Sequence, residues 1–485
     1  MSGSSDTAHF GDADQVDLIV IGAGPVGENV ADRAVQGGLS VTIVESELVG
    51  GECSYWACMP SKVLLRAGAA LRGARDAPGA GGRGEVDVPA VLRRRDEIAS
   101  HWDDAGQVDW LEGAGITLVR GHGRLTGERE VTVDGDRVLR ARHAVAVCTG
   151  SAALLPDIPG LAEARPWTSR EATAVQDVPE SLVILGGGVV ACEMATAYTS
   201  FGCAVTVLSR SPLLDRMEPF AGERVADALR DAGADVRSGV ETTRVERGGT
   251  GVTVELGDGS VVTAAEVLVA TGRVPRTSDV GLETVGLEPG EWLDVDDTLR
   301  VRGSDWLYAV GDVNHRALLT HQGKYQARAA GDVIAARAQG DEVEDGPWGR
   351  HVATADHAAV PQVTFTDPEV GSVGLTESAA RDAGRRVRVL DLDLASIAGA
   401  STHSARYAGA ARAVVDEDAQ VLVGATFVGP DVGEMVQAAT IAIVGEVPLS
   451  RLWHAVPSYP TVGEVWLRWL EAYGRESGSV AILRG

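Results

Sequence analysis

Residues 17–27 read Asp-Leu-Ile-Val-Ile-Gly-Ala-Gly-Pro-Val-Gly, and this stretch decides the fold. A short apolar run that ends in a glycine-rich turn predicts a buried strand, a tight loop and the start of a helix. Gly22, Gly24 and Gly27 stand where such a loop lets backbone N–H groups and the helix dipole hold a pyrophosphate. The stretch therefore predicts the first βαβ unit of a dinucleotide-binding domain.

The same pattern recurs later in the chain. The apolar run 182–185 is followed by Gly186-Gly187-Gly188, and a second apolar strand follows each copy, at 41–44 and at 205–208. One glycine motif alone is weak evidence, whereas two copies with the same continuation are strong. We therefore predict an α/β chain with two Rossmann-like nucleotide-binding domains.

Glu45 and Ser209 end the two second strands, and each lies equally far from the first glycine of its own motif. An acid at this position binds an adenosine ribose hydroxyl and repels a 2′-phosphate, so Glu45 fits FAD. Ser209 removes the acid, and Arg210 beside it offers a planar cation for a phosphate, which favours NADPH over NADH at the second site. The alternative for Arg210 is a solvated loop charge, and Arg216 either shares its role or has none.

Cys53 and Cys58 lie in the run 50–62, Gly-Gly-Glu-Cys-Ser-Tyr-Trp-Ala-Cys-Met-Pro-Ser-Lys. Two thiols this close together after a nucleotide-binding fingerprint suggest a redox-active disulfide beside a flavin. A regular helix would separate their Cα atoms by about 7.5 Å along its axis, beyond the roughly 4.4 to 6.8 Å that a disulfide tolerates, so we expect a distorted turn. Pro60 suits the first turn of a helix and would hold Met59 extended, which places Cys58 near a helix N-terminus, where a thiolate is favoured.

Two other interpretations of these cysteines are possible. The first is that they are two unrelated buried thiols. The second is that they bind zinc, which is disfavoured because no further Cys or His pair stands nearby at ligand spacing. We expect no metal site.

Composition limits the possible partners. The 485 residues suggest about three domains, and the net charge of -26, from 69 acids against 43 bases, disfavours nucleic acid and anionic membranes. No apolar run reaches the length of a membrane span, and residues 1–14 are expected to be a disordered leader, so we expect a cytoplasmic protein. In that reducing compartment a disulfide is catalytic more often than structural, and Cys148, Cys192 and Cys203 are expected to be packing residues.

From about residue 15 onward, the chain resembles the class I pyridine nucleotide-disulfide oxidoreductases, the flavoprotein family of glutathione reductase, dihydrolipoamide dehydrogenase and mercuric reductase. Further motifs support the resemblance: Thr-Gly-Ser at 149–151, Ala-Thr-Gly-Arg at 270–273, Tyr-Ala-Val-Gly-Asp-Val at 308–313, and the run 360–369, which is similar to the opening of the family's dimerisation domain. The resemblance implies that Asp312 binds the ribityl chain of the flavin. It also implies that further residues contact the cofactors, FAD at Gly51, Thr149 and Gly150, and NADPH at Gly186, Gly188 and Gly272.

The family's FAD-binding domain is discontinuous, and this sets the domains that we expect here. Residues 15–150 and 275–350 would form the FAD-binding domain, and residues 151–274 the NAD(P)H-binding domain. Residues 351–485 would form an α+β dimerisation domain, which implies a homodimer.

The resemblance also assigns catalytic roles. Hydride passes from NADPH to the flavin, which reduces the disulfide; Cys58 would be the thiolate beside the flavin and Cys53 the thiol that attacks the substrate. Lys62 and Glu193 would form a pair beside the flavin ring. Lys62 is one of two lysines among the 43 basic residues, which suggests that a compact ammonium is needed there. For Glu193 the alternative is an ordinary acid on a helix surface.

The chain departs from the family near its C-terminus, where disulfide reductases carry His-Pro-Thr followed by an acid. Tyr459 replaces the histidine, while Glu464 supplies the acid. A histidine with a pKa near 6.5 protonates a leaving thiolate readily, whereas a tyrosine with a pKa near 10 does not. Tyrosine at this position is similar to mercuric reductase and soluble transhydrogenase, although the family's C-terminal metal-capturing thiols are absent. His454 is the alternative base, and a structural role is expected for it.

Tyr55 and Trp56 lie between the two cysteines, where their side chains would narrow access to Cys53.

Taken together, these motifs predict an FAD-containing, NADPH-dependent oxidoreductase that passes electrons through Cys58 and Cys53 to a small or specialised disulfide. One alternative is transfer straight from the flavin to a pyridine nucleotide, a quinone or a metal ion. The other is an electron-donating or redox-sensing module whose partner is a protein.

Overall fold

The computed structural model describes residues 15–249, 251–404 and 406–474, and the chain divides into two compact units. Unit 1 consists of the described residues up to Tyr55 together with Ser100–Ala152 and Arg273–Asp356. Unit 2 consists of Trp56–Ala99, Ala153–Gly272 and the described residues from His357 onward. The leader predicted at residues 1–14 lies outside the described residues.

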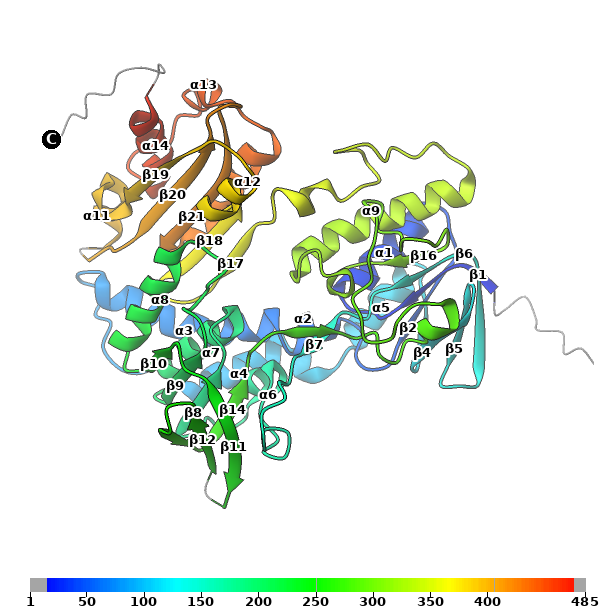
Figure 1. Ribbon diagram of the computed structural model, residues 1–485, viewed down its shortest axis with the longest axis horizontal. Coiled ribbons are helices and arrows are strands. Elements are labelled where there is room, and N and C mark those ends of the chain that lie inside the picture. The colour runs from blue at the N-terminus through cyan, green and yellow to red at the C-terminus, as the bar shows by residue number, and fades with distance from the viewer. Residues whose placement is uncertain (1–14, 250, 405, 475–485) are drawn as a thin grey trace, which may run out of the picture. The chain divides into compact units, whose positions relative to one another are not determined.

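Unit 1 is built on a seven-stranded sheet (Figure 1). The strands β3, β2, β1 and β6 are parallel in that order, β16 pairs in parallel with one end of β6, and β5 and β4 continue the sheet in antiparallel. β1 has its last four residues buried, as expected of a strand covered on both faces. The strands are β1 (Gln15–Ile21), β2 (Val41–Glu45), β3 (Thr117–Arg120), β4 (Gly123–Gly127), β5 (Glu130–Val133), β6 (Arg137–Val147) and β16 (Leu307–Ala309).

The longest helix of unit 1, α9 (Thr320–Gln339), packs along α1 (Pro25–Gln36), and Figure 1 shows the two side by side. Small residues permit this close approach, because a Cβ added at Gly331 would lie 2.5 Å from the Cβ of Arg33. The unit also contains α2 (Gly51–Tyr55) and α5 (Ala105–Gly113).

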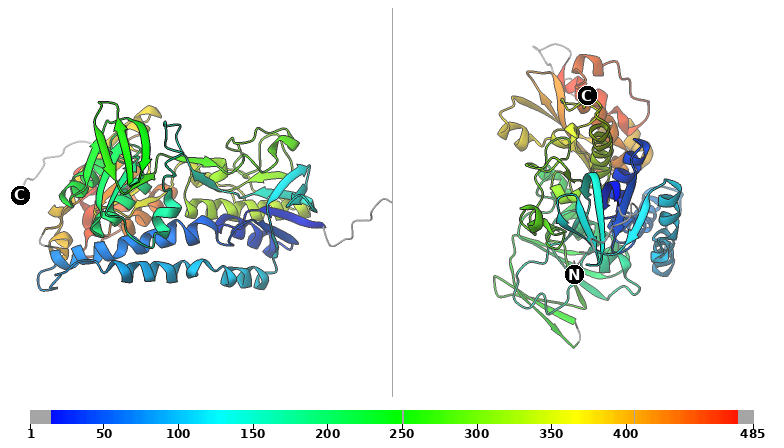
Figure 2. Two further views of the ribbon diagram at one scale, coloured as in Figure 1. Left: turned by 90° about the horizontal axis from the view of Figure 1, so that it is seen from below. Right: turned by 90° about the vertical axis from the view of Figure 1, so that its right-hand side faces the viewer.

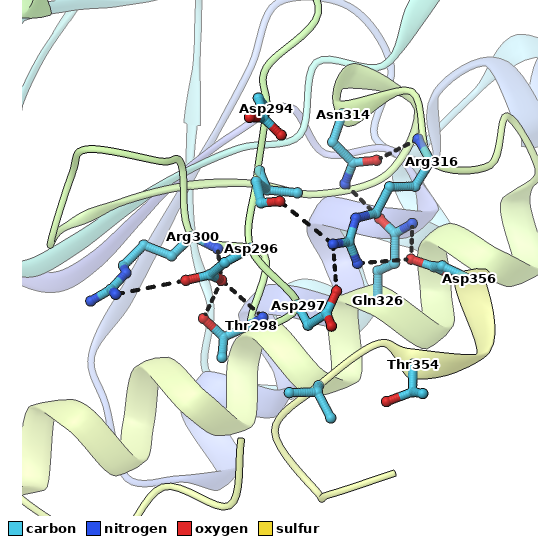
Figure 3. A network of polar contacts seen from close by, with 12 residues as sticks. Asp294, Asp296, Asp297, Thr298, Arg300, Asn314, Arg316, Gln326, Thr354 and Asp356 are labelled. Atoms are coloured by element: carbon cyan, nitrogen blue, oxygen red, sulfur yellow. Dashed lines mark hydrogen bonds and ion pairs between the residues drawn. The ribbon is translucent and has the colours of Figure 1, made fainter. Parts of the chain in front are cut away.

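A buried polar network holds the loop that follows β16 (Figure 3). Gln326 on α9 accepts hydrogen bonds from the Gly311 N–H at 2.9 Å and from Asn314 Nδ2 at 2.8 Å, and it donates to Asp356 at 2.9 Å. Burial raises the pKa of Asp356, although its hydrogen-bond donors oppose the effect. Asp312 lies in the sequence between Gly311 and Asn314, and the hydrogen bonds of these two residues to Gln326 fix its backbone position.

Unit 2 contains a second parallel sheet, in the order β10-β9-β8-β14, and a three-stranded antiparallel sheet β11-β12-β13. The long helices α3 and α4 lie side by side (Figure 2), and α3 also packs against α7. The strands are β8 (Ser181–Leu185), β9 (Ala204–Ser209), β10 (Asp235–Ser238), β11 (Thr242–Gly248), β12 (Gly251–Leu256), β13 (Val261–Ala264) and β14 (Glu266–Val269). The helices are α3 (Cys58–Asp76), α4 (Val88–Ile98), α6 (Ser169–Ala174), α7 (Val189–Ser200) and α8 (Pro219–Asp231). Two short strands, β7 (Ser151–Ala153) and β15 (Arg273–Pro275), pair with each other where the chain passes between the units.

The C-terminal part of unit 2 is a five-stranded antiparallel sheet, in the order β17-β18-β21-β20-β19. Its core includes Phe427 and Trp469, whose ring centroids lie 5.4 Å apart. The strands are β17 (Gln362–Thr364), β18 (Glu369–Gly374), β19 (Val387–Asp393), β20 (Ala410–Asp416) and β21 (Val421–Gly429). The helices are α10 (Glu377–Asp382), α11 (Ala398–His403), α12 (Val436–Val444), α13 (Leu449–Leu452) and α14 (Val465–Tyr473).

These elements confirm the predicted fold class, two Rossmann-like α/β sheets followed by an α+β domain. The predicted domain bounds stay a prediction, since the compact units group α3 and α4 with the second nucleotide sheet. Cys148, Cys192 and Cys203 are buried in the core as expected, and burial raises the pKa of Cys203 to about 11. Within the described ranges, no helix combines the length and the hydrophobicity needed to cross a membrane.

Candidate functional site

The first glycine loop, in unit 1, has the geometry of a phosphate cradle. Gly22 has φ +101°, and a Cβ there would lie 2.6 Å from the Cys148 carbonyl oxygen. A Cβ at Gly27 would lie 1.9 Å from the Gly22 carbonyl oxygen, and a Cβ at Gly51 would lie 2.9 Å from the Cα of Gly24. Gly24 caps α1 without a side-chain hydrogen bond, so the N–H groups of the first turn remain available to a phosphate.

Glu45 stands at the end of β2, as predicted, and both of its carboxylate oxygens are held by the backbone. Oε2 accepts a hydrogen bond from the Ala23 N–H at 2.7 Å, and Oε1 accepts one from the Glu47 N–H at 2.7 Å. The carboxylate is thereby anchored against the glycine loop itself. This is the arrangement expected of an acid that binds an adenosine ribose hydroxyl.

Asp312 is held by side chains from two other segments of unit 1. Ser151 Oγ donates to Asp312 Oδ2 at 2.5 Å and accepts from Arg273 Nε at 2.5 Å. Thr149 Oγ1 donates to the Arg276 carbonyl at 2.8 Å, and Gly150 has φ +71°. The Asp312 carboxylate remains partly exposed, so it can accept a further hydrogen bond from a ligand hydroxyl.

These residues fit FAD, because the glycine loop, Glu45 and Asp312 match its pyrophosphate, ribose and ribityl groups in turn. When bound, FAD supplies a flavin ring that exchanges hydride with a nicotinamide and electrons with thiols. The part of this chain is to hold and orient the cofactor.

The second glycine loop, in unit 2, repeats the first. Gly186 has φ +124°, and a Cβ there would lie 2.2 Å from the Ala270 carbonyl oxygen, as Gly22 does relative to Cys148. Gly188 caps α7 without a side-chain hydrogen bond. Gly272 has φ +153°, a conformation that favours glycine.

The position equivalent to Glu45 is Ser209, at the end of β9. Its hydroxyl donates to the Ser211 carbonyl at 2.7 Å, and a Cβ on Gly187 would lie 2.5 Å from that hydroxyl. Arg210 and Arg216 are exposed, and among the described residues neither guanidinium has a hydrogen bond or an ion pair. Both are therefore available to an anionic ligand.

The segment that carries the two cysteines is an interrupted helix. α2 ends at Tyr55 and α3 begins at Cys58, while Ala57 lies outside the helical region with φ −133° and ψ −101°. The predicted distortion and the position of Cys58 at a helix N-terminus are therefore confirmed. The expectation for Met59 was wrong, since α3 includes it; Pro60 lies in the first turn, where the missing N–H costs no intrahelical bond. Cys53 and Cys58 are both half-buried.

Lys62 and Glu193 form the pair that the family resemblance implies, within unit 2. Lys62 Nζ lies 2.9 Å from Glu193 Oε2, and Glu193 is 3% exposed, so it is not an ordinary surface acid. The other carboxylate oxygen, Oε1, accepts the Phe365 N–H at 3.0 Å. The Lys62 ammonium also lies 4.8 Å from the centroid of the Phe365 ring, a cation–π contact.

Tyr459 and Glu464, near the C-terminus, differ from Lys62 and Glu193 in their exposure. Tyr459 is 76% exposed, whereas Glu464 is 5% exposed and its Oε2 is buried without a hydrogen-bond partner in the described part of the chain. The guanidinium of Arg468, one helical turn further on, lies 3.8 Å from Glu464 Oε1. The roles predicted for Tyr459 and Glu464 stay predictions, and His454 is exposed.

Sequence reasoning missed Glu28 and Phe365. Glu28 lies in the first turn of α1, where its buried Oε1 has no hydrogen-bond partner among the residues that the structure describes, and burial raises its pKa to about 7. Its signal in the sequence was an acid directly after Gly27, the last glycine of the fingerprint. Phe365 gave no signal, because its contacts join residues far apart in the chain.

Comparison with known proteins identifies the family of this chain. The family described as pyridine nucleotide-disulphide oxidoreductase matches residues 16–340, and the dimerisation domain of the same family matches residues 360–469. A dihydrolipoyl dehydrogenase of Synechocystis sp. is 32% identical over 93% of this chain and 97% of its own length. A mercuric reductase of Staphylococcus aureus is 30% identical over 95% of this chain and 83% of its own length.

Solved structures show the same fold. The Cu(II) complex of the HOCl-induced flavoprotein disulfide reductase RclA from Escherichia coli has a TM-score of 0.81 at 22% identity, covering 95% of this chain and 100% of that one. LpdA from Mycobacterium tuberculosis has a TM-score of 0.78 at 24% identity, with 95% and 100% covered. The chain belongs to the pyridine nucleotide-disulphide oxidoreductases. It is an FAD-dependent enzyme driven by a pyridine nucleotide.

Proposed function

We propose that this enzyme uses NADPH to reduce a small or specialised disulfide through a redox-active Cys53–Cys58 pair. The observation that carries the proposal is the start of α3, which begins at Cys58 and one turn later places Lys62 against the buried Glu193 carboxylate. A helix N-terminus favours a thiolate, and the ammonium one turn further along the helix is held in place by the buried Glu193 carboxylate. We propose that a stabilised thiolate at Cys58 and a positioned ammonium at Lys62, both on α3, serve electron transfer between the flavin and the disulfide.

Each of the named residues has a separate role in the proposed reaction. The overall reaction is balanced: NADPH, one proton and the substrate disulfide give NADP⁺ and two substrate thiols. Cys53 attacks one substrate sulfur to form a mixed disulfide, which expels the first thiolate. Cys58 then attacks the Cys53 sulfur, releases the second thiolate and restores the disulfide of the enzyme. The glycine loop of residues 22–27, with Glu45 and Asp312, holds the cofactor that returns two electrons to this disulfide.

The substrate class that we propose follows from the residue that replaces the family's histidine. Tyr459, a weak acid, stands where disulfide reductases of the family carry a histidine, so we propose a substrate whose leaving thiolate is stable without prompt protonation. A low-pKa thiol, such as an aromatic one, meets this condition. The same replacement supports the alternative that electrons leave the flavin directly, for a quinone, a metal ion or a second pyridine nucleotide, because these acceptors release no thiolate that needs a proton.

Alkylation separates these two functions. The NADPH-reduced enzyme is treated with iodoacetamide, cleared of reagent, and assayed with an aromatic disulfide and with a benzoquinone. We expect disulfide reduction to fall at least about a hundredfold while quinone reduction is retained, because the modified sulfur is the nucleophile of the first reaction. Loss of neither activity would show that the thiols are bystanders, and the direct transfer would then be the function.

NADPH is the nucleotide that we propose, on the support of Ser209 and the two unpaired arginines that follow it. Replacing Arg210 or Arg216 by Ala removes a cation from the 2′-phosphate, and a charge-assisted hydrogen bond is worth about 1.5 to 3 kcal/mol. We therefore expect KM for NADPH to rise about 10- to 100-fold with kcat nearly unchanged. Steady-state kinetics with both nucleotides provide the test.

The matched control for this pair is Arg230→Ala, an exposed arginine on α8 that is paired with Asp227. It should leave both KM values unchanged. A rise in KM for NADH as large as that for NADPH would contradict the assignment, as would an unchanged KM for NADPH in both variants; a rise in only one variant would show that the other arginine does not bind the 2′-phosphate.

We further propose that the enzyme works as a cytoplasmic homodimer. The matched dimerisation domain and its exposed apolar side chains, which include Ile441 and Val456, support the dimer. A working dithiol supports a reducing compartment. A protein that delivers the disulfide is the remaining alternative, which trapping a mixed disulfide with a Cys58→Ser variant would reveal.

A further inference from the structure

The interruption between α2 and α3 leaves one backbone carbonyl without its helical donor. In a continuous helix the Trp56 carbonyl would accept a hydrogen bond from the N–H of residue 60. That residue is Pro60, which has no N–H. Backbone carbonyls in folded proteins are almost always paired, and at this position the donor cannot be the N–H of residue 60.

Thr173 on α6 supplies it. Its Oγ1 lies 2.8 Å from the Trp56 carbonyl oxygen, and the residue is 2% exposed. The same hydroxyl lies 2.9 Å from the Ser169 carbonyl, one turn back in α6, but that carbonyl has the Thr173 N–H as its regular helical donor. The hydroxyl proton is therefore free to be donated to the Trp56 carbonyl, at the shorter of the two distances.

Both ends of α6 are anchored. A capping box between Thr168 and Glu171 closes its N-terminus. At the other end Arg95, which is fully buried on α4, donates to the carbonyls of Thr173 and Val175, the latter at 2.6 Å. Although α6 has only six residues, hydrogen bonds hold both of its ends in place.

The side chain of Trp56 is held by the same helix. The Arg170 guanidinium lies 4.1 Å from the centroid of the Trp56 ring, which is a close cation–π contact. The backbone and the side chain of Trp56 are therefore both held by α6, two residues before Cys58 in the sequence.

We propose that Thr173 is a positioning residue for the redox pair: its hydroxyl replaces the donor that Pro60 lacks and keeps the helix interrupted between Cys53 and Cys58. The inference rests on the proposed redox role of these cysteines. In the oxidised enzyme the S–S bond itself imposes the interruption, since a regular helix would hold the two Cα atoms too far apart. In the dithiol form the contacts of Trp56 keep that shape, which favours closure of the disulfide.

The test is a redox titration of the FAD-loaded enzyme in glutathione buffers, without NADPH. The enzyme disulfide and two glutathione molecules exchange with the enzyme dithiol and one glutathione disulfide, so two electrons and two protons are balanced. Alkylation followed by mass spectrometry measures the dithiol fraction. For Thr173→Val, which keeps the shape and loses the hydroxyl, we expect the equilibrium to shift about tenfold toward the dithiol, equivalent to about 30 mV.

Thr173→Ser is the matched control, because it retains the hydroxyl and should titrate like the wild type. A Thr173→Val enzyme that also titrates like the wild type would overturn the inference while leaving the redox pair intact. A wild type that forms no disulfide at any glutathione ratio would overturn the proposed function and this inference with it.

Arg170→Ala provides a second variant in case Thr173→Val does not fold. It removes the cation–π contact and leaves the buried interior of α6 untouched. We expect a shift of about threefold toward the dithiol, and no shift in this variant would likewise count against the role of Trp56.

Discussion

A Cys53→Ser enzyme is expected to lose disulfide reduction by at least about a thousandfold and to show a long-wavelength absorbance band before any reductant is added. Cys53 is the proposed nucleophile, so its removal ends the reaction with disulfides. Cys58, freed from its partner, remains as a thiolate at the N-terminus of α3, where that ionised form is favoured. A thiolate beside an oxidised flavin donates charge to it, which produces the band.

Cys58→Ser is the matched variant, since it differs by one sulfur atom at the other position. It should lose disulfide reduction to the same extent and show no band at any pH. Activity with a benzoquinone should survive in both variants. Identical spectra for the two variants would contradict the assignment of Cys58 as the thiol beside the flavin, and full disulfide activity in either would exclude the redox pair.

Lys62→Met is expected to slow NADPH-dependent flavin reduction about a hundredfold, as does the loss of one fixed electrostatic group in other enzymes. The same change leaves the Glu193 carboxylate buried without its cation, which costs about 3 kcal/mol of folding free energy. Stopped-flow absorbance measures the first effect, and urea unfolding measures the second.

A double variant separates the chemistry from the stability. Lys62→Met with Glu193→Gln removes both charges, so it should regain most of the lost folding free energy while flavin reduction stays slow. Lys62→Arg should not restore the rate, because a planar guanidinium does not match the position of a compact ammonium. Recovery of the rate in the double variant would show that Lys62 acts through stability alone.

The repeated glycine motif made most of the fold predictable. It set the ends of β2 and β9, and the equivalent places of Glu45 and Ser209 followed from counting along the sequence. Steric rules fixed this outcome, because Gly22 and Gly186 each face a carbonyl that no side chain could approach. Local rules also located the break before Cys58, although they misplaced Met59.

The parts that could not be predicted depend on contacts across the chain. Thr173 and Trp56 are joined by one hydroxyl, and Phe365 meets Glu193 through a backbone N–H, so neither pair leaves a pattern in the sequence. The family resemblance supplied Lys62 with Glu193, whose side chains form a 2.9 Å ion pair. The same resemblance could not say what an exposed Tyr459 does.

An anaerobic titration of the FAD-loaded enzyme with NADPH, followed by its visible spectrum, tests the central claim most directly. If Cys53 and Cys58 form a working redox pair, a long-wavelength thiolate-to-flavin band appears after two electrons per subunit and disappears when the thiols are alkylated. If the flavin absorbance bleaches after two electrons without such a band, electrons do not reach the cysteines, and the proposed disulfide chemistry is wrong.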